Sequence, residues 1–134
     1  MNRGILLTAA VTGALGVIIG AFGAHGLEDF IAGYSQEPEH IAKRLAQFDT
    51  GARYHLVHAV ALVALASLPV ARATRVAAVL FVAGVILFSG SLYVLVLTDT
   101  SWLGAITPLG GLAWIFAWAS LMFIKPVAQA SSKG

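Results

Sequence analysis

The chain has no cysteine and very few charged side chains. Among its 134 residues are eight Lys or Arg and six Asp or Glu, which amounts to 10% charged residues and a net charge of +2. Without cysteine there can be no disulfide, thiolate metal ligand or cysteine nucleophile. Soluble domains usually have about a quarter of their residues charged. The basic residues are also scattered, so the composition excludes an ordinary water-soluble fold and a nucleic-acid binder.

Apolar residues, in contrast, make up 59% of the chain. They lie in four runs, at about residues 5–24, 54–71, 76–97 and 102–124. About 20 apolar residues are enough for a helix to cross a bilayer core. The first run is longer than the apolar region of a signal peptide, and no run alternates as the strands of a membrane barrel do. We therefore expect one all-α integral membrane domain, residues 1–134, built as a bundle of four transmembrane helices.

The distribution of charge predicts the orientation of these four spans. The N-terminus, the connection at 72–75 and the polar tail at 126–134 would share one side of the membrane. Five basic residues and no acid belong to that side: Arg3, Arg72, Arg75, Lys125 and Lys133. The other side has three basic residues and all six acids. Because cytoplasmic loops are enriched in Lys and Arg, we expect both termini in the cytoplasm.

The outer loop, residues 25–53, is the only long hydrophilic connection, and we expect a short amphipathic helix within it. Apolar residues recur there at helical spacing: Ile41, Leu45, Phe48 and Ala52. Pro38 suits the first turn of such a helix, and Gly51 is expected to loosen its join to the second span. Arg44 lies off the apolar stripe, and His40 is expected to face water.

Glycines recur along one face of the first apolar run. Gly13, Gly16, Gly20 and Gly23 are three or four residues apart, which lays a smooth groove along a helix. Such grooves let a neighbouring helix approach closely in a membrane. We interpret the four glycines as a helix-packing surface. The alternative is a groove for a lipid or quinone tail.

Five polar residues near the predicted outer ends of the spans are the candidate functional residues: His25, Tyr54, His55, His58 and Tyr93. Three interpretations are open for this cluster. The imidazoles would bind zinc, copper or a haem; the cluster would pass protons or hold a quinone head group; or the side chains would hydrogen-bond across helices at the head-group level. We favour the third, and we predict no cofactor.

Motifs typical of enzymes are absent from the sequence. It has no phosphate-binding glycine loop, no HExxH and no GxSxG. The Ser89-Gly90-Ser91 triplet lies inside the third run, where hydroxyls usually bond to helix carbonyls or to a neighbouring helix. Pro108, followed by two glycines, indicates a kink or a delayed helix start. We therefore predict no catalytic residues and a protein that is not an enzyme.

Four segments, one in each run, carry a resemblance to a known family. They are Gly20-Ala21-Phe22-Gly23-Ala24-His25-Gly26-Leu27; Tyr54 with His58-Ala59 and Ala61-Leu62; Leu87-Phe88-Ser89-Gly90-Ser91-Leu92-Tyr93 with Leu97-Thr98; and Ile106-Thr107-Pro108-Leu109-Gly110-Gly111 with Trp118. The chain resembles the domain of unknown function 423 family, which includes small bacterial inner-membrane proteins and animal relatives named transmembrane protein 256.

This resemblance implies a four-helix protein of the bacterial inner membrane without an assigned activity, and it supplies no catalytic residues. The family motif includes His25, Tyr54, His58 and Tyr93, whereas His55 stands where the family often has Gln. We predict a non-enzymatic accessory, assembly or structural protein. Its expected partners are membrane lipid and either a homo-oligomer or a larger membrane complex. The alternative is a binding or transport module for a metal ion, proton or quinone that uses an outer-leaflet His/Tyr cluster.

Overall fold

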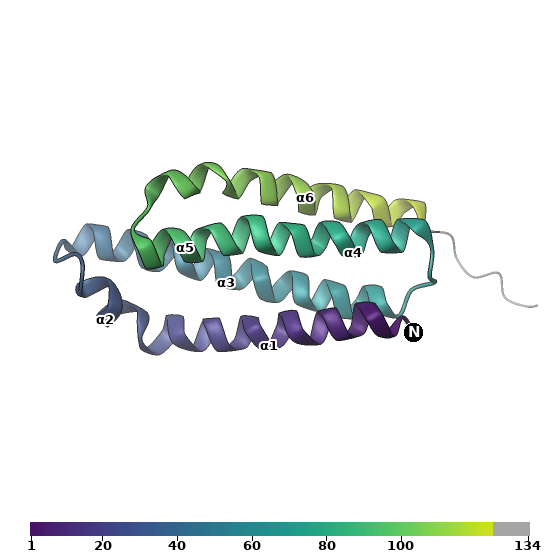
Figure 1. The fold of residues 1–134 in the computed structure, drawn as a ribbon, viewed down its shortest axis with the longest axis horizontal. Coiled ribbons are helices and arrows are strands. Elements are labelled where there is room, and N and C mark those ends of the chain that lie inside the picture. The colour runs from purple at the N-terminus through teal and green to yellow at the C-terminus, as the bar shows by residue number, and fades with distance from the viewer. Residues whose placement is uncertain (125–134) are drawn as a thin grey trace, which may run out of the picture.

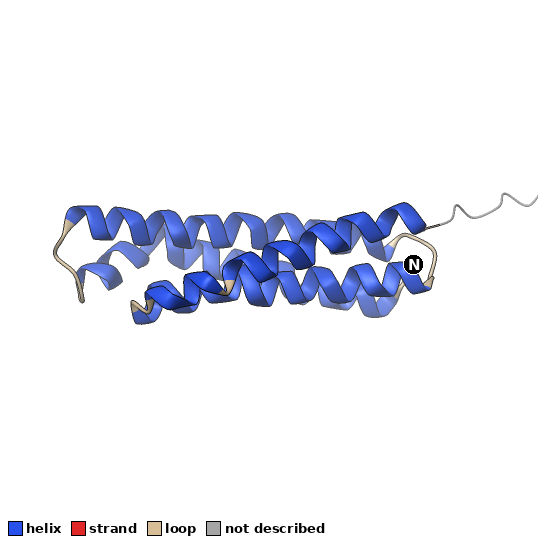
Figure 2. Ribbon diagram, turned by 90° about the horizontal axis from the view of Figure 1, so that it is seen from above, coloured by secondary structure: helices blue, strands red, loops and turns tan. Residues whose placement is uncertain are grey.

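The computed structural model describes residues 1–124, and every regular element in that range is a helix (Figures 1 and 2). The elements are α1 (Arg3–His25), α2 (Leu27–Ala32), α3 (Pro38–Ala66), α4 (Arg72–Gly84), a π-helical segment (Val85–Gly90), α5 (Ser91–Thr98), a 3-10 segment (Ser101–Ala105), α6 (Thr107–Ser120) and a 3-10 turn (Leu121–Phe123). The all-helical prediction is confirmed for this part of the chain. The polar tail predicted at 126–134 lies outside it.

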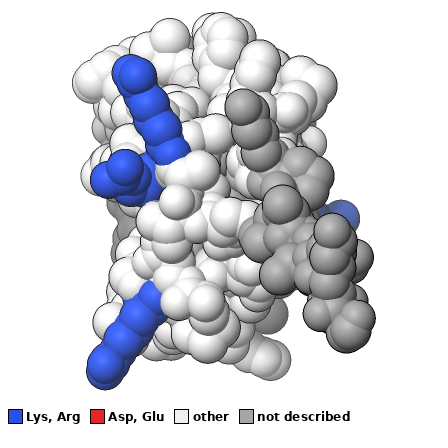
Figure 3. All heavy atoms as spheres, turned by 90° about the vertical axis from the view of Figure 1, so that its right-hand side faces the viewer, with Lys and Arg blue, Asp and Glu red and all other residues white. Residues whose placement is uncertain are grey.

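The long helices run side by side in the order α1, α3, α4 with α5, and α6 (Figure 1). One end of the molecule, called here the arginine end, contains Arg3, Arg72 and Arg75. There the backbone N–H of Asn2 donates to the carbonyl of Ala66, which joins the start of α1 to the end of α3 over 2.7 Å. Figure 3 views the arginine end, where basic side chains project and no acidic side chain is visible. The opposite end, called here the acidic end, contains α2, the start of α3 and Asp99.

Helix α3 is one continuous helix of 29 residues. The expected short amphipathic helix, separate from the second span, is therefore wrong. No residue between Asp49 and Tyr54 interrupts a helix, and Gly51 is buried inside α3 rather than loosening it. A Cβ atom at Gly51 would lie 3.1 Å from Cε1 of Tyr93, so this glycine allows α3 to lie close to α5.

Three helical stretches are long and apolar enough to cross a membrane: Arg3–His25, Arg72–Thr98 and Ser101–Phe123. Helix α3 is not among them, because its apolar half contains Asp49, Arg53 and two histidines. The described part of the chain is thus that of a helical membrane protein.

The last of the three apolar stretches begins with a 3-10 segment, and α6 starts only at Thr107, with Pro108 in its first turn. This delayed helix start confirms the prediction from Pro108.

The predicted glycine face of α1 lies largely against α3. A Cβ atom at Gly16 would lie 2.8 Å from Cδ2 of Leu56, and one at Gly23 would lie 2.9 Å from Cε1 of Phe48. At Gly13 the nearest atom is the Cβ of Ala59, at 3.9 Å. Gly20 differs, because no atom lies within 4 Å of its Cβ position. The structure thus brings three of the four glycines to α3 and leaves Gly20 beside open space.

The core has two parts. Toward the arginine end, Leu62, Phe81 and Trp114 are buried where α3, α4 and α6 meet. Toward the acidic end, Leu27 and Phe48 belong to a second buried cluster of α2, α3 and α5. Helix α4, the π-helical segment and α5 follow one another without a break and form one helical column. This column contributes residues to both parts of the core.

At Gly110, α6 lies directly against the backbone of the π-helical segment. A Cβ atom at Gly110 would lie 2.3 Å from the backbone nitrogen of Phe88. Similarly, a Cβ atom at Gly84 would lie 2.2 Å from Cδ1 of Trp114. A side chain at Gly110 would meet backbone atoms, which cannot rotate away, so the two helices would have to separate.

We predict that Gly110→Ala lowers the stability of the protein by about 1–3 kcal/mol, because overpacking forces backbone shifts. Gly111→Ala is the matched control, since its Cβ atom would lie 3.9 Å from Cδ2 of Phe88, an ordinary contact. That control should unfold at or slightly above the wild-type temperature, because Ala favours a helix over Gly. Thermal unfolding in mild detergent, followed by circular dichroism, measures both. Equal unfolding temperatures for the two variants would contradict the prediction.

Candidate functional site

The two histidines of α3 lie in the middle of the molecule rather than at an outer end. His55 contacts the carbonyl of Thr12, which is the tenth of the 23 residues of α1. His58 contacts Trp118, two residues before the end of α6 at Ser120. The sequence placed both histidines at the start of a span, but α3 begins at Pro38. The two histidines therefore lie about five helical turns from the start of α3, not at its outer end as expected.

His55 joins three helices through its imidazole. Its Nε2 donates to the carbonyl oxygen of Thr12 in α1 over 2.9 Å. Its Nδ1 lies 3.1 Å from the hydroxyl of Tyr93 in α5 and accepts from it. A neutral imidazole has one donor and one acceptor nitrogen, and here both are used. His55 is 4% exposed, so these bonds lie in the interior.

His58 lies among aromatic rings between α3 and α6. Its Nδ1 donates to the carbonyl oxygen of Tyr54 over 2.7 Å, and its Nε2 accepts from the indole N–H of Trp118 over 3.3 Å. The imidazole stacks on Trp114 with ring centroids 3.8 Å apart and planes 3° apart. Both nitrogens of His58 are therefore engaged as well.

The five candidate residues are thus divided among three places. His55 is hydrogen-bonded to Tyr93, and His58 is hydrogen-bonded to the backbone carbonyl of Tyr54. His25 is apart from both pairs and is exposed at the end of α1. A metal would need the nitrogen lone pairs that already accept hydrogen bonds. Among the described residues, no group of three His, Cys, Asp or Glu side chains is arranged to hold a metal ion. The geometry favours hydrogen bonding between helices over metal binding for His55 and His58.

Hydroxyl groups make the same kind of contact. Ser89, in the π-helical segment, donates to the carbonyl oxygen of Gly51 in α3 over 2.7 Å. Ser91 donates to the carbonyl oxygen of Phe88, and its oxygen lies 2.9 Å from the hydroxyl of Thr107 in α6. This confirms the prediction that these serines bond to helix carbonyls and neighbouring helices.

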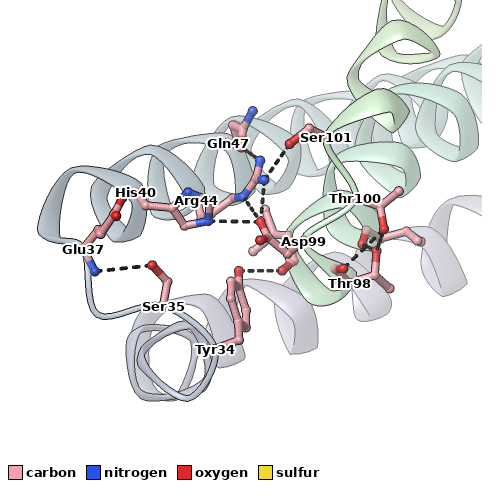
Figure 4. Close-up of polar contacts among 12 residues, drawn as sticks. Tyr34, Ser35, Glu37, His40, Arg44, Gln47, Thr98, Asp99, Thr100 and Ser101 are labelled. Atoms are coloured by element: carbon pink, nitrogen blue, oxygen red, sulfur yellow. Dashed lines mark hydrogen bonds and ion pairs between the residues drawn. The ribbon is translucent and has the colours of Figure 1, made fainter.

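An ion pair between a buried arginine and a partly exposed aspartate lies at the acidic end, and the sequence did not reveal it (Figure 4). Arg44 of α3 is 2% exposed, and its Nε donates to Oδ1 of Asp99 over 2.8 Å. Its remaining guanidinium nitrogens donate to Asp99, to Gln47 and to Ser101. Asp99 ends α5 in the left-handed conformation, with φ of 52°. The interaction joins α3 to the turn between α5 and α6.

Two further side chains complete this network. Nε2 of His40 lies 3.0 Å from Oδ1 of Asp99, so the expectation that His40 only faces water is wrong. The hydroxyl of Tyr34 donates to the carbonyl oxygen of Val96 over 2.8 Å. Hydrogen bonds from Arg44 hold the pKa of Asp99 below its ordinary value. Partial burial, together with the negative charge of Asp99, raises the pKa of Tyr34.

The sequence does contain a signal for the burial of Arg44. The buried residues of α3 include a series at alternating intervals of four and three: Arg44, Phe48, Gly51, His55, His58, Leu62 and Leu65. Extending the apolar positions Leu62 and Leu65 backwards at this spacing reaches Arg44. The apolar stripe considered alone points instead to Ile41 and Leu45, which are only half-buried.

Long apolar helices whose inward-facing polar groups bond to one another define an integral membrane protein of the helical class. The chain belongs to the family described as protein of unknown function DUF423, whose model matches residues 19–111. The family predicted from the sequence motifs is therefore confirmed.

Relatives of the chain come from bacteria and from a fungus. The membrane protein YwdK of Bacillus subtilis is 42% identical, over 87% of this chain and 91% of its own length. A membrane protein of Haemophilus influenzae is 34% identical, over 92% of this chain and 94% of its own. The membrane protein C1782.12c of Schizosaccharomyces pombe is 35% identical, over 85% and 94%. No solved structure matches the chain.

We predict that Asp99→Asn destabilises the protein by about 1 kcal/mol at pH 7, because the buried guanidinium loses its charged partner, while the 41% exposure of the Asp99 side chain lets solvent reduce the loss. The folded pKa of Asp99 is lowered, so the ion pair contributes stability above the ordinary carboxyl pKa of 3.8. That contribution is lost as the pH falls from 3.8 through the lower folded pKa. The difference between wild type and variant should therefore shrink over that range, as measured by thermal unfolding at a series of pH values.

Asp49→Asn is the matched control for this experiment. It removes an exposed ion pair within α3, in which Nε of Arg53 lies 2.7 Å from Oδ2 of Asp49. Exposed pairs contribute little to stability, so this variant should unfold close to the wild-type temperature. Equal losses for Asp99→Asn and Asp49→Asn, or a difference independent of pH, would contradict a structural role for the pair of Arg44 and Asp99.

Proposed function

We propose that this chain is a four-span protein of a bacterial inner membrane, with both termini in the cytoplasm. We further propose that it acts without catalysis, as an accessory or assembly subunit in a homo-oligomer or a larger membrane complex. The proposal has three parts, which are the number of spans, their orientation and the role of the protein.

The connectivity of the helices supports α3 as a further span, in addition to the three apolar stretches. Helices α1 and α4 both start at the arginine end, and α1 finishes at the opposite end. The chain must therefore return to the arginine end before α4 begins, and α3 makes this return. With 29 residues, α3 is about 44 Å long, which exceeds the bilayer core of about 30 Å. Its charged first turns would then reach beyond the core.

The charges support an orientation with the arginine end in the cytoplasm. Arg3, Arg72 and Arg75 lie at that end, and none of them has an ion-pair partner within residues 1–124. Arg44 is paired with Asp99 at the acidic end, and Arg53, in the middle of α3, is paired with Asp49. The unpaired positive charge therefore concentrates on one side, as is typical of cytoplasmic loops. Apolar helices, rather than barrels, also favour an inner membrane.

The role of accessory subunit depends on one observation: the polar interior is satisfied within the chain. Within residues 1–124, no buried side-chain nitrogen or oxygen lacks a hydrogen-bond partner. No interior group is left unpaired to act on a substrate. The two outer helices, in contrast, are mostly exposed, with 22% of the apolar part of α1 and 17% of that around α6 buried. These faces are available to lipid and to neighbouring membrane helices.

We predict that single cysteines at the two ends will react from opposite sides of the membrane. Because the chain has no cysteine of its own, Glu37→Cys and Val70→Cys each introduce a unique label. A membrane-impermeant maleimide should label Glu37→Cys in intact cells, and Val70→Cys only after permeabilisation. Both positions lie outside the helices and leave the basic residues unchanged. Labelling of both from the same side would contradict a crossing by α3.

We also predict that the protein, extracted from its own membranes in mild detergent, will be found in a stoichiometric assembly. Native mass spectrometry gives the mass of that assembly and identifies the subunits. The variant Asp99→Asn, which removes the ion pair with Arg44, serves as the control for assembly that depends on correct folding. A protein that is monomeric and free of partners across several mild detergents would contradict the accessory role.

A further inference from the structure

An open groove lies between α3 and α6, on the outer surface of the bundle. It has a volume of about 440 Å³ and is lined mostly by aromatic side chains, among them Tyr54, His58, Phe88, Trp114 and Trp118. We call it the aromatic groove. The neighbouring side chains Val57 and Ile115 are 56% and 62% exposed, so the groove opens toward the surrounding lipid.

Three rings in the aromatic groove are nearly parallel. Trp114 stacks on His58 with planes 3° apart, and Tyr54 lies 5.6 Å from Trp114 with planes 12° apart. Trp114 is 4% exposed, whereas Tyr54 and Trp118 are each 48% exposed. Tyr54 and His58 are only 6.2 Å apart, too close for Trp114 to lie between them, so they lie side by side against Trp114. The rings of the groove that reach the surface are Tyr54 and Trp118, and a flat ring that enters the groove would contact these two.

The hydroxyl of Tyr54 has no hydrogen-bond partner in the described part of the chain, where Tyr54 bonds only through its backbone. Its ring lies 5.1 Å from that of Phe88, the seventeenth of the 27 residues from Arg72 to Thr98. The middle of this span is the fourteenth residue, so Tyr54 lies only about 5 Å from the mid-plane. Tyrosines of membrane proteins are enriched instead at the two interfaces.

An unpaired hydroxyl at this depth is costly, because lipid chains accept no hydrogen bond. Ester carbonyls of phospholipids lie at the edge of the core, about 15 Å from the mid-plane. They are too far from Tyr54 to accept its proton. The hydroxyl therefore fits an acceptor that a ligand brings into the apolar core.

We propose that the aromatic groove binds a membrane quinone. The quinone ring lies in the aromatic groove with its edge toward Tyr54, one carbonyl oxygen accepts the hydroxyl of Tyr54, and the isoprenoid tail extends into lipid. A quinone combines the required features, since it is flat, apolar and carries a carbonyl acceptor. The depth argument depends on the four-span insertion proposed above.

The test is a titration of the purified protein in lipid nanodiscs with decylubiquinone. Quinones quench tryptophan fluorescence, and the variant Trp102→Phe leaves Trp114 and Trp118, both in the groove, as the only indoles. We expect saturable quenching in this background. Adding Tyr54→Phe, which removes one hydroxyl and keeps the ring, should weaken binding about fivefold to tenfold. Circular dichroism of each variant verifies the helical fold.

Tyr34→Phe is the matched control, because the hydroxyl of Tyr34 bonds to Val96 at the acidic end, away from the groove. It should leave the affinity unchanged. Three results would overturn the quinone site: quenching that does not saturate, equal affinity after Tyr54→Phe, or equally strong competition by decylbenzene, which lacks a carbonyl. If cysteine labelling places α3 across the membrane and the titration fails, only the quinone site is overturned. If labelling puts both ends on one side, the four-span insertion itself is overturned.

Discussion

One polar stripe on α3 bonds to α1, α5, α6 and the π-helical segment, and the rest of the structure depends on it. Arg44 binds Asp99 at the end of α5, the carbonyl of Gly51 accepts from the π-helical segment, His55 joins α1 to α5, and His58 binds α6. In lipid there is no water to take over these bonds, so each must be made within the protein. Because apolar contacts distinguish poorly between neighbours in lipid, such bonds also select which helix faces which.

The packing around this stripe requires residues without side chains. Gly51, Gly84 and Gly110 each lie where a Cβ atom would approach a neighbouring helix to 3.1 Å or less. Gly51 lets α3 come within hydrogen-bonding distance of Ser89, whereas Gly84 and Gly110 let α6 lie close to α4 and to the π-helical segment. The π-helical segment Val85–Gly90 lies at the same level. Such segments shift the register of a helix. Here the π-helical segment contains Ser89, which donates to the carbonyl of Gly51.

The interior and the surface of the protein therefore differ in character. Within residues 1–124, each buried side-chain nitrogen or oxygen has a hydrogen-bond partner, and His55 and His58 act as links between helices rather than as ligands. On the surface, the hydroxyl of Tyr54 has no hydrogen-bond partner among the described residues. A structural interior combined with an outward-facing aromatic groove is compatible with a subunit that works through what binds to its surface.

The sequence by itself determined the class of protein, the family, the all-helical fold, the delayed start of α6 and the local bonding of the serines. These properties follow from local features, namely apolar runs, motifs, and the positions of Pro and small residues. Only the tertiary structure decided that α3 is continuous, that His55 and His58 lie far from its start, and that Arg44 is buried. The partner of Arg44 is Asp99, 55 residues away in the chain. Hydropathy is summed over neighbours in sequence, so a charge neutralised by a distant residue is read as exposed until the helices are packed.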